Sequence, residues 1–138
     1  MRCIKMVGII AISHGSYAKA LINSVEMIYG KQEKIRTICL EVDKSIESLK
    51  DKIDRTIEEL NVDEVLMLVD ILGGTPYNAA CLFMDRKNVN IITGMNMPMI
   101  LEIIPYMVQD LEKISSLAEH FGQNGVINIR QRYNDIQK

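Results

Sequence analysis

Short apolar segments alternate with helical patterns along most of the chain, and this order constrains the fold more than any other feature. The predicted strands are residues 6–13, 34–42, 63–70 and 89–93. Two of them, 6–13 and 63–70, are almost continuously apolar, which is typical of strands buried on both faces. Because parallel strands need helical crossovers, the alternation predicts an α/β three-layer sandwich, with a mainly parallel central sheet covered by helices on both faces.

Between these segments, apolar residues recur every three or four positions, as they do in helices with one buried face. The clearest example is 45–60, where one apolar stripe is formed by Ile46, Leu49, Ile53, Ile57 and Leu60. The other predicted helices span 16–30, 75–86, a stretch from residue 98 onward, and a region around 110–121. A last segment, 125–133, is predicted to be a further strand, whose direction the sequence leaves open.

Two ionisable residues stand directly after predicted strands. His14 follows the first strand in "AISHGSY" (11–17), and Asp70 closes the third. In a doubly wound sheet of order 2-1-3-4, the loops after the first and third strands flank the crevice where ligands usually bind. We therefore predict that His14 and Asp70 lie together, although they are far apart in the sequence.

The turn after Asp70, "ILGGTPYNAA" (71–80), has a composition suited to an anion such as phosphate. The two glycines allow a ligand to approach the main chain closely, and Thr75 is predicted to cap the next helix. After His14, a glycine leaves the approach open and a serine starts the next helix. The predicted phosphoryl-binding residues are Gly15, Ser16, Gly73, Gly74 and Thr75.

These parts suit nucleophilic catalysis on a phosphoryl group. A neutral imidazole attacks phosphorus without first losing a proton, and a carboxylate on its other nitrogen fixes the tautomer and stabilises the developing charge. His14 and Asp70 are therefore the candidate catalytic residues. Taken alone, His14 is equally well a loop histidine, Asp70 a strand-end cap, and the glycines a tight turn. Their convergence at one edge favours a site.

Composition excludes several classes of function. The 138 residues fit one domain, 1–138, and a net charge of −2 gives no basis for binding nucleic acid. No apolar run reaches the length of a membrane helix, and the apolar N-terminal stretch lacks a signal cleavage site. The three cysteines, Cys3, Cys39 and Cys81, are expected to be small buried residues in a reducing compartment. His120 is expected to be structural, and neither a metal nor a cofactor is expected.

Three stretches together resemble a known family. They are "GIIAISHGSYAKAL" (8–21), "LMLVDILGGTPYNAA" (66–80) and "ITGMNMPMILE" (92–102). They are similar, in order and over most of the chain, to the mannose-type IIA component (mannose/fructose/sorbose family) of the bacterial phosphoenolpyruvate-dependent sugar phosphotransferase system. In that comparison the family's phosphorylated histidine falls on His14, its partner aspartate on Asp70, and its loop serine on Thr75.

The resemblance implies a phosphocarrier, a phosphotransferase with a phosphohistidine intermediate. The phosphoryl donor would be HPr, and the acceptor would be a IIB component that serves sugar uptake through the membrane subunits IIC and IID. Because no IIB domain follows residue 133, IIB is expected to be a separate polypeptide. The resemblance also implies a cytoplasmic homodimer that meets the membrane through the transporter, with a C-terminal strand exchanged between subunits. Segment 125–133 is the candidate for that strand.

Two residues depart from the family pattern, and three alternatives stay open. Leu72 stands where the family commonly has an aromatic residue, and Tyr77 where it often has Phe; Leu72 bears on the surface that recognises HPr or IIB. The alternatives are a regulatory module whose phosphorylation at His14 reports sugar supply, a phosphocarrier for a dihydroxyacetone kinase, and a flavodoxin-like cofactor binder. The last lacks a GxGxxG or Walker motif.

Overall fold

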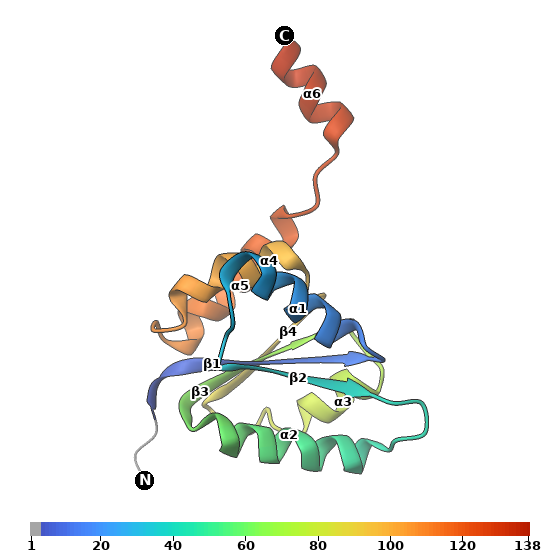
Figure 1. The fold of residues 1–138 in the computed structure, drawn as a ribbon, viewed down its shortest axis with the longest axis vertical. Coiled ribbons are helices and arrows are strands. Elements are labelled where there is room, and N and C mark those ends of the chain that lie inside the picture. Colours follow the sequence, from blue (N-terminus) through green and yellow to red (C-terminus); the bar gives the residue numbers. More distant parts are fainter. Residues whose placement is uncertain (1–3) are drawn as a thin grey trace.

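A four-stranded parallel sheet with the order β2-β1-β3-β4 forms the centre of the structure, a computed structural model that describes residues 4–138 (Figure 1). Its strands are β1 (Ile4–His14), β2 (Ile35–Leu40), β3 (Val62–Val69) and β4 (Val89–Thr93). The predicted order 2-1-3-4 is confirmed, and β2 lies at an edge as expected. The winding reverses between β1 and β3, so the loops that follow these two strands are neighbours.

Helices cover both faces of the sheet, which confirms the predicted three layers (Figure 1). The helices are α1 (Tyr17–Tyr29), α2 (Ile46–Leu60), α3 (Thr75–Cys81), α4 (Met97–Ile103), α5 (Leu111–Asn124) and α6 (Ile129–Gln137), with a 3₁₀ turn at Ile104–Tyr106. One apolar core lies between the sheet and α1, α4 and α5, and a second lies under α2 and α3. Adjacent residues of β1 and β3 alternate between the two cores, which explains why these strands are apolar throughout.

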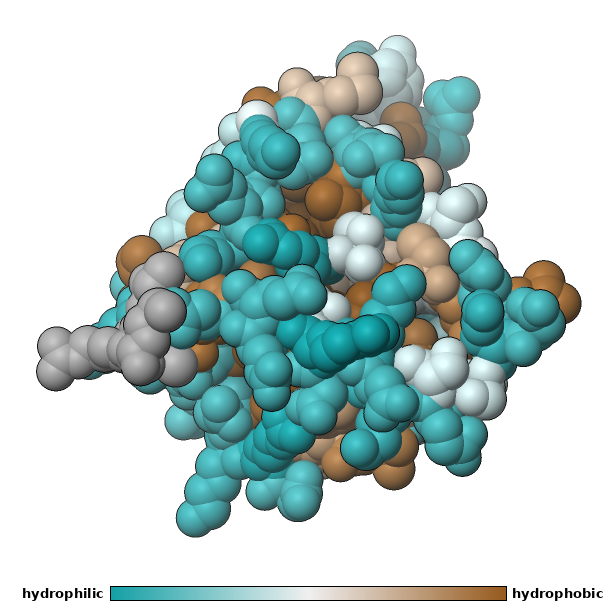
Figure 2. Space-filling view, turned by 60° about the horizontal axis from the view of Figure 1, so that its bottom comes forward, coloured by the Kyte–Doolittle hydropathy of each residue, from teal (hydrophilic) through white to brown (hydrophobic). Residues whose placement is uncertain are grey.

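Helix α2 shows how the sequence pattern produces this packing. Ser45 caps its start by accepting a hydrogen bond from the Ser48 amide at 3.1 Å, and Asn61 ends it in the left-handed conformation. Leu49, Ile53 and Leu60 are buried against the sheet. Figure 2, in which the α2 side comes forward, shows a face covered mainly by hydrophilic side chains. The predicted stripe therefore faces the core and the charged residues face solvent.

Helix α3 is shorter than predicted, ending at Cys81 instead of residue 86. The chain continues in turns closed by three-residue hydrogen bonds, such as that from the Phe83 amide to the Ala80 carbonyl at 3.0 Å. These turns bury the Phe83 ring, with the Arg86 guanidinium 4.7 Å from its centroid. The helix therefore ends five residues before the predicted position, and the following turns bury an aromatic ring.

The prediction of a strand at 125–133 is wrong. Residues 126–128 form no assigned element, and α6 follows from Ile129 to Gln137, projecting away from the rest of the molecule (Figure 1). Asn128 caps α6 by accepting a hydrogen bond from the Gln131 amide at 3.2 Å. In this single chain α6 buries none of its residues against the rest of the molecule, so the local helical spacing of Ile129, Tyr133 and Ile136 determines its conformation.

Two further expectations concern the cysteines and the membrane. Cys39 and Cys81 are free but half-buried, instead of fully buried as expected, whereas Cys3 lies outside the described residues. Across residues 4–138, no helix combines the length and apolar character needed to cross a membrane.

Candidate functional site

His14 is the last residue of β1 and lies at the carboxyl edge of the sheet. Its backbone is still in register with Leu40 of β2, whereas the pairing of β1 with β3 ends two residues earlier, at Ile12 and Val69. The His14 side chain is 52% exposed. The strand therefore carries the imidazole out of the core and presents it to an incoming molecule.

Asp70 is the first residue after β3, and its side chain binds the end of β1 just beyond the last β1–β3 pair. Its Oδ2 accepts a hydrogen bond from the His14 amide at 2.8 Å and lies 2.8 Å from the ring Nδ1 of His14. Its Oδ1 accepts from the Ile71 amide at 3.0 Å, and the side chain is only 13% exposed. One carboxylate thus extends the hydrogen bonding of the sheet and orients the imidazole. The structure brings these two predicted residues into direct contact.

The environment of Asp70 determines its protonation state. Burial raises the pKa of its carboxyl, but the hydrogen bonds from the His14 amide and ring, the charge of that ring and the Ile71 amide outweigh it. Together they hold the pKa below its ordinary value of 3.8. The ionised carboxylate only accepts hydrogen bonds, so the network assigns the proton of the neutral ring to Nδ1. Nε2 then keeps a free lone pair.

Gly74 lies against the Nε2 side of the imidazole. A Cβ at this position would be 3.1 Å from Cε1 and 3.3 Å from Nε2 of His14. Gly73 and Gly74 have φ of +84° and +88°, a conformation that favours glycine. The prediction that Thr75 caps α3 is wrong. Gly74, with its positive φ, is the N-cap residue, and Thr75 is already the first residue of the helix.

The turn after His14 is held differently from the prediction. Ser16 precedes α1 as expected, but within the described chain it makes no side-chain capping hydrogen bond. Instead Ser13 Oγ accepts from the Ala18 amide at 2.7 Å and donates to the Gly15 carbonyl at 3.2 Å. Sequence reasoning missed Ser13, whose only signal is a polar residue closing an apolar strand. Gly15, at φ +53°, leaves open space where a side chain would stand.

The loop after β4 completes this edge of the sheet. The Tyr17 hydroxyl, also missed by sequence reasoning, donates a hydrogen bond to the Met95 carbonyl at 2.9 Å and so ties α1 to this loop. Asn96 caps α4 by accepting from the Met99 amide, and its amide group donates to the Gly122 carbonyl. Three loops therefore converge on one edge of the sheet, but the polar atoms of Asn96 are used in hydrogen bonds that hold α4 and α5 in place.

The second histidine, His120, lies on α5. Its ring packs edge-on against Phe121 with centroids 5.2 Å apart, and its carbonyl accepts from the Asn124 side chain at 2.8 Å. These neighbours all belong to its own helix. In the part of the chain that the structure describes, no cluster of His, Cys, Asp and Glu is arranged to hold a metal ion.

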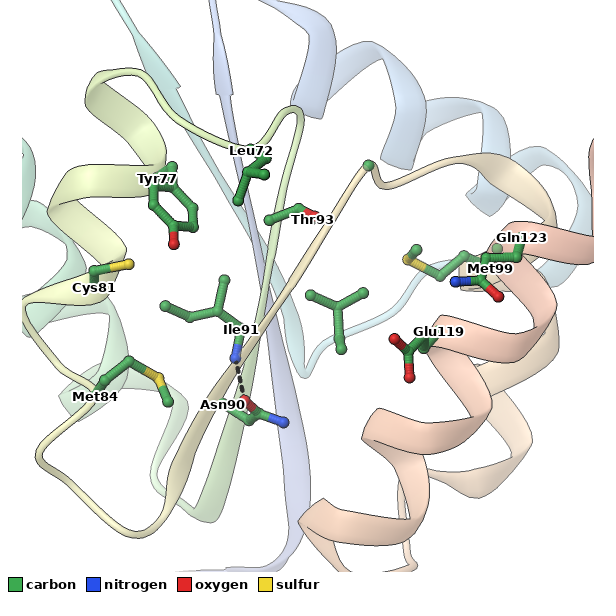
Figure 3. A pocket seen from close by; sticks show the side chains of 13 residues that line it. Leu72, Tyr77, Cys81, Met84, Asn90, Ile91, Thr93, Met99, Glu119 and Gln123 are labelled. Atoms are coloured by element: carbon green, nitrogen blue, oxygen red, sulfur yellow. Dashed lines mark hydrogen bonds between the residues drawn. The ribbon is translucent and has the colours of Figure 1, made fainter.

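A groove of about 540 Å³ lies beside the His14 edge, along β4 between α3 and α5 (Figure 3). Tyr77, Cys81 and Met84 line one side, and Glu119 and Gln123 the other. A hydrogen bond with the Cys81 thiol raises the pKa of the Tyr77 phenol. The groove reaches the rim of the candidate site at two loop residues, Leu72 and Gly94.

Comparison with known proteins identifies the family of the chain. Residues 8–121 match the EIIA-man family, described as the phosphotransferase system (PTS) fructose IIA component. The chain belongs to this family. The matched range contains both His14 and Asp70 and stops before α6. This IIA component is 31% identical over 125 residues to the fructose-specific EIIA component of Bacillus subtilis, covering 89% of this chain and 78% of that protein.

Two further relatives extend the comparison. The sorbose-specific EIIA component of Lacticaseibacillus casei is 38% identical over 96 residues, covering 69% of this chain and 70% of that protein. The crystal structure of a PTS IIA protein associated with the fucose utilization operon of Streptococcus pneumoniae is 31% identical, with a TM-score of 0.83. The alignment with this structure covers 96% of the present chain and 99% of the Streptococcus pneumoniae protein. This chain is thus a mannose-type IIA component of the sugar phosphotransferase system.

Proposed function

We propose that this IIA component is a phosphocarrier whose His14 accepts a phosphoryl group from phospho-HPr and passes it to a IIB component for sugar uptake. The observation that carries the proposal is the contact between Asp70 and Nδ1 of His14 at an exposed edge of the sheet. It leaves Nε2 as the free nucleophile, in the orientation that a neutral imidazole needs.

The transfer step follows from this arrangement. The Nε2 lone pair forms a bond to phosphorus while the bond between phosphorus and the donor nitrogen breaks, and the donor nitrogen keeps that electron pair. The ring of His14 becomes positively charged, and the Nδ1 proton stays on the hydrogen bond to Asp70, whose carboxylate stabilises the charge. Transfer to IIB reverses these steps, so neither direction needs a metal or cofactor from this chain.

The phosphoryl oxygens need neutral donors, since the sequence places no Lys or Arg in 11–16 or 70–80. Ser16 lies on the loop that follows β1 and Thr75 on the turn that follows β3, and neither hydroxyl is used as a helix cap. Gly15, Gly73 and Gly74 leave room for the group to approach the main chain. Preorganised dipoles of this kind stabilise charge that develops during transfer. The lack of cations also disfavours a free nucleotide as the donor.

The surface around His14 suits a protein donor. Three aliphatic side chains on the adjoining loops are well exposed: Val42, Ile71 and Leu72. Val42 follows β2, and the other two follow Asp70, so all lie at the edge of the sheet that carries His14. Exposed apolar groups gathered around a reactive residue mark a protein contact. We assign them to the docking surface for HPr and IIB.

We also propose that the protein is a homodimer. Val126, Ile127 and Ile129 are exposed in the single chain, and β4 has an unpaired edge beside the groove of Figure 3. Both features are unfavourable in an isolated molecule, because apolar surface and strand edges promote association. Packing of 126–138 of one copy along the β4 groove of the other would cover both.

The decisive experiment is labelling with phosphoenolpyruvate, enzyme I and HPr. The wild-type protein should acquire acid-labile phosphate, and His14→Ala should acquire none. His120→Ala is the matched control and should be labelled as the wild type, because the hydrogen bonds and ring contact described for His120 lie within α5, away from His14. Persistent labelling of His14→Ala, or an unlabelled wild type, would overturn the proposal.

A further inference from the structure

Ser13, the residue before His14, carries a fully buried hydroxyl that is 0% exposed. Its Oγ accepts a hydrogen bond from the Ala18 amide at 2.7 Å and donates one to the Gly15 carbonyl at 3.2 Å. The two partners lie on the far side of His14 in the sequence. A single hydroxyl therefore ties the end of β1 to the turn and to the first turn of α1, with His14 held between.

The location of Ser13 explains why such a tie is needed. At this point the pairing of β1 with β3 has ended, and the chain reverses through Gly15 at φ +53°. A Cβ at Gly15 would meet no atom within 4 Å, so no described atom packs against that side of the turn. Hydrogen bonds restrain the turn at several points: the Gly15 amide donates to the Leu40 carbonyl at 2.9 Å, the His14 amide donates to Asp70, and Ser13 makes its two bonds.

The energetic cost of burying a hydroxyl indicates that Ser13 is present for the hydrogen bonds that its side chain makes. A buried hydroxyl is costly unless hydrogen-bonded, and an apolar residue of similar size would fill this core position equally well. Ser115 offers the contrast within the same molecule. Its Oγ is buried without a hydrogen-bond partner in the described structure. Both serines are buried, but of the two only Ser13 has a hydroxyl that holds a turn in the described structure.

We propose that Ser13 is a positioning residue for phosphoryl transfer: its hydroxyl holds the β1–α1 turn so that the His14 ring keeps Nδ1 on Asp70 and Nε2 toward the incoming phosphoryl group. The proposal rests on the proposed function of His14. The chemical reason is that transfer depends on in-line placement of the nucleophile, and small displacements of a reacting group are costly in rate.

The kinetic test compares Ser13→Ala with Ser115→Ala in phosphorylation by phospho-HPr. Ser13→Ala should lower kcat roughly tenfold to a hundredfold, with KM for the donor unchanged, because the proposed docking side chains lie on other loops. Ser115→Ala should keep the wild-type kcat, and Ser13→Thr, which retains the hydroxyl, should recover most of the lost rate. A wild-type kcat for Ser13→Ala, or an equal loss in Ser115→Ala, would overturn the proposal.

A spectroscopic test is independent of phosphotransfer. ¹⁵N chemical shifts of the His14 ring should show a single tautomer protonated on Nδ1 in the wild type and in Ser115→Ala, and a mixture in Ser13→Ala. An unchanged tautomer in Ser13→Ala contradicts the positioning role even if the protein proves not to be a phosphocarrier. Should Ser13→Ala not fold, amide exchange of the wild type provides the test, since a rapidly exchanging Ala18 amide would refute the hydrogen bond.

Discussion

The carboxylate of Asp70 performs two tasks with adjacent bonds. Through the His14 amide it continues the sheet beyond the last β1–β3 pair, and through Nδ1 it orients the ring that we propose to be phosphorylated. Because one oxygen, Oδ2, makes both contacts, the backbone and side chain of His14 are positioned relative to the same atom. Displacement of the strand end would therefore also displace the imidazole.

Gly74 gives a sharp residue-level prediction because Gly73 is its matched control. Both glycines have φ near the left-handed region, so Gly73→Ala and Gly74→Ala should each lower the free energy of unfolding by about 1–2 kcal/mol. Only at position 74 does the new methyl group crowd Nε2 of His14. Phosphorylation of Gly74→Ala should slow roughly a hundredfold, and clearly more than that of Gly73→Ala, whose new methyl group does not crowd His14. Denaturant unfolding and rapid-quench labelling would measure the two effects; equal rates would contradict the crowding.

At the scale of elements, α6 differs from the other helices in having no core to pack on. Its side chains are exposed along its whole length, whereas α1, α2 and α5 each bury an apolar face. An amphipathic segment without a partner gains little from its own helical propensity, since most helix stability comes from packing. We therefore expect the conformation of 126–138 to depend on what covers it.

The C-terminal segment yields the element-scale prediction. If 126–138 joins two copies, the wild type should sediment as a dimer, and a variant with Val126→Asp and Ile127→Asp should sediment as a monomer. The buried charges would oppose packing of this segment into the groove along β4. Val42→Asp is the control, because Val42 is at least as exposed but lies at the other end of the sheet order, after β2. A wild-type monomer would refute the homodimer.

For the whole molecule, the site is coupled to folding through Asp70. Its pKa is lower in the folded state than its ordinary value of 3.8, so folding favours the ionised carboxylate. This contribution to stability is complete above the unfolded pKa and is lost as the pH falls through the folded pKa. The site therefore contributes to acid stability of the entire domain.

This coupling predicts the shape of the stability curve in acid. The free energy of unfolding of the wild type should fall more steeply than that of Asp70→Asn as the pH drops from about 5 to about 3. Other carboxylates contribute equally to both proteins and cancel in the difference. Parallel curves for the wild type and Asp70→Asn would contradict the lowered pKa.

The sheet order, the layers and most element boundaries were predictable because they depend on local patterns. Continuous apolar runs indicate strands buried on both faces, and three- and four-residue spacings indicate helices with one buried face. From the winding order alone, His14 and Asp70 could be placed at one edge. Where prediction failed, the local pattern was not decisive: the chain turns after Cys81 and buries Phe83, and 126–138 is exposed along its length instead of pairing with the sheet.

By itself, the sequence determined the architecture, the family, and the two ionisable residues that meet after the strands. Tertiary contacts decided the finer chemistry: which imidazole nitrogen faces Asp70, which glycine lies against the ring, and which serine holds the turn. The physical reason is that a hydrogen bond is specified by the positions of two atoms. For His14 and Asp70 those positions exist only once the crossover has brought β1 beside β3.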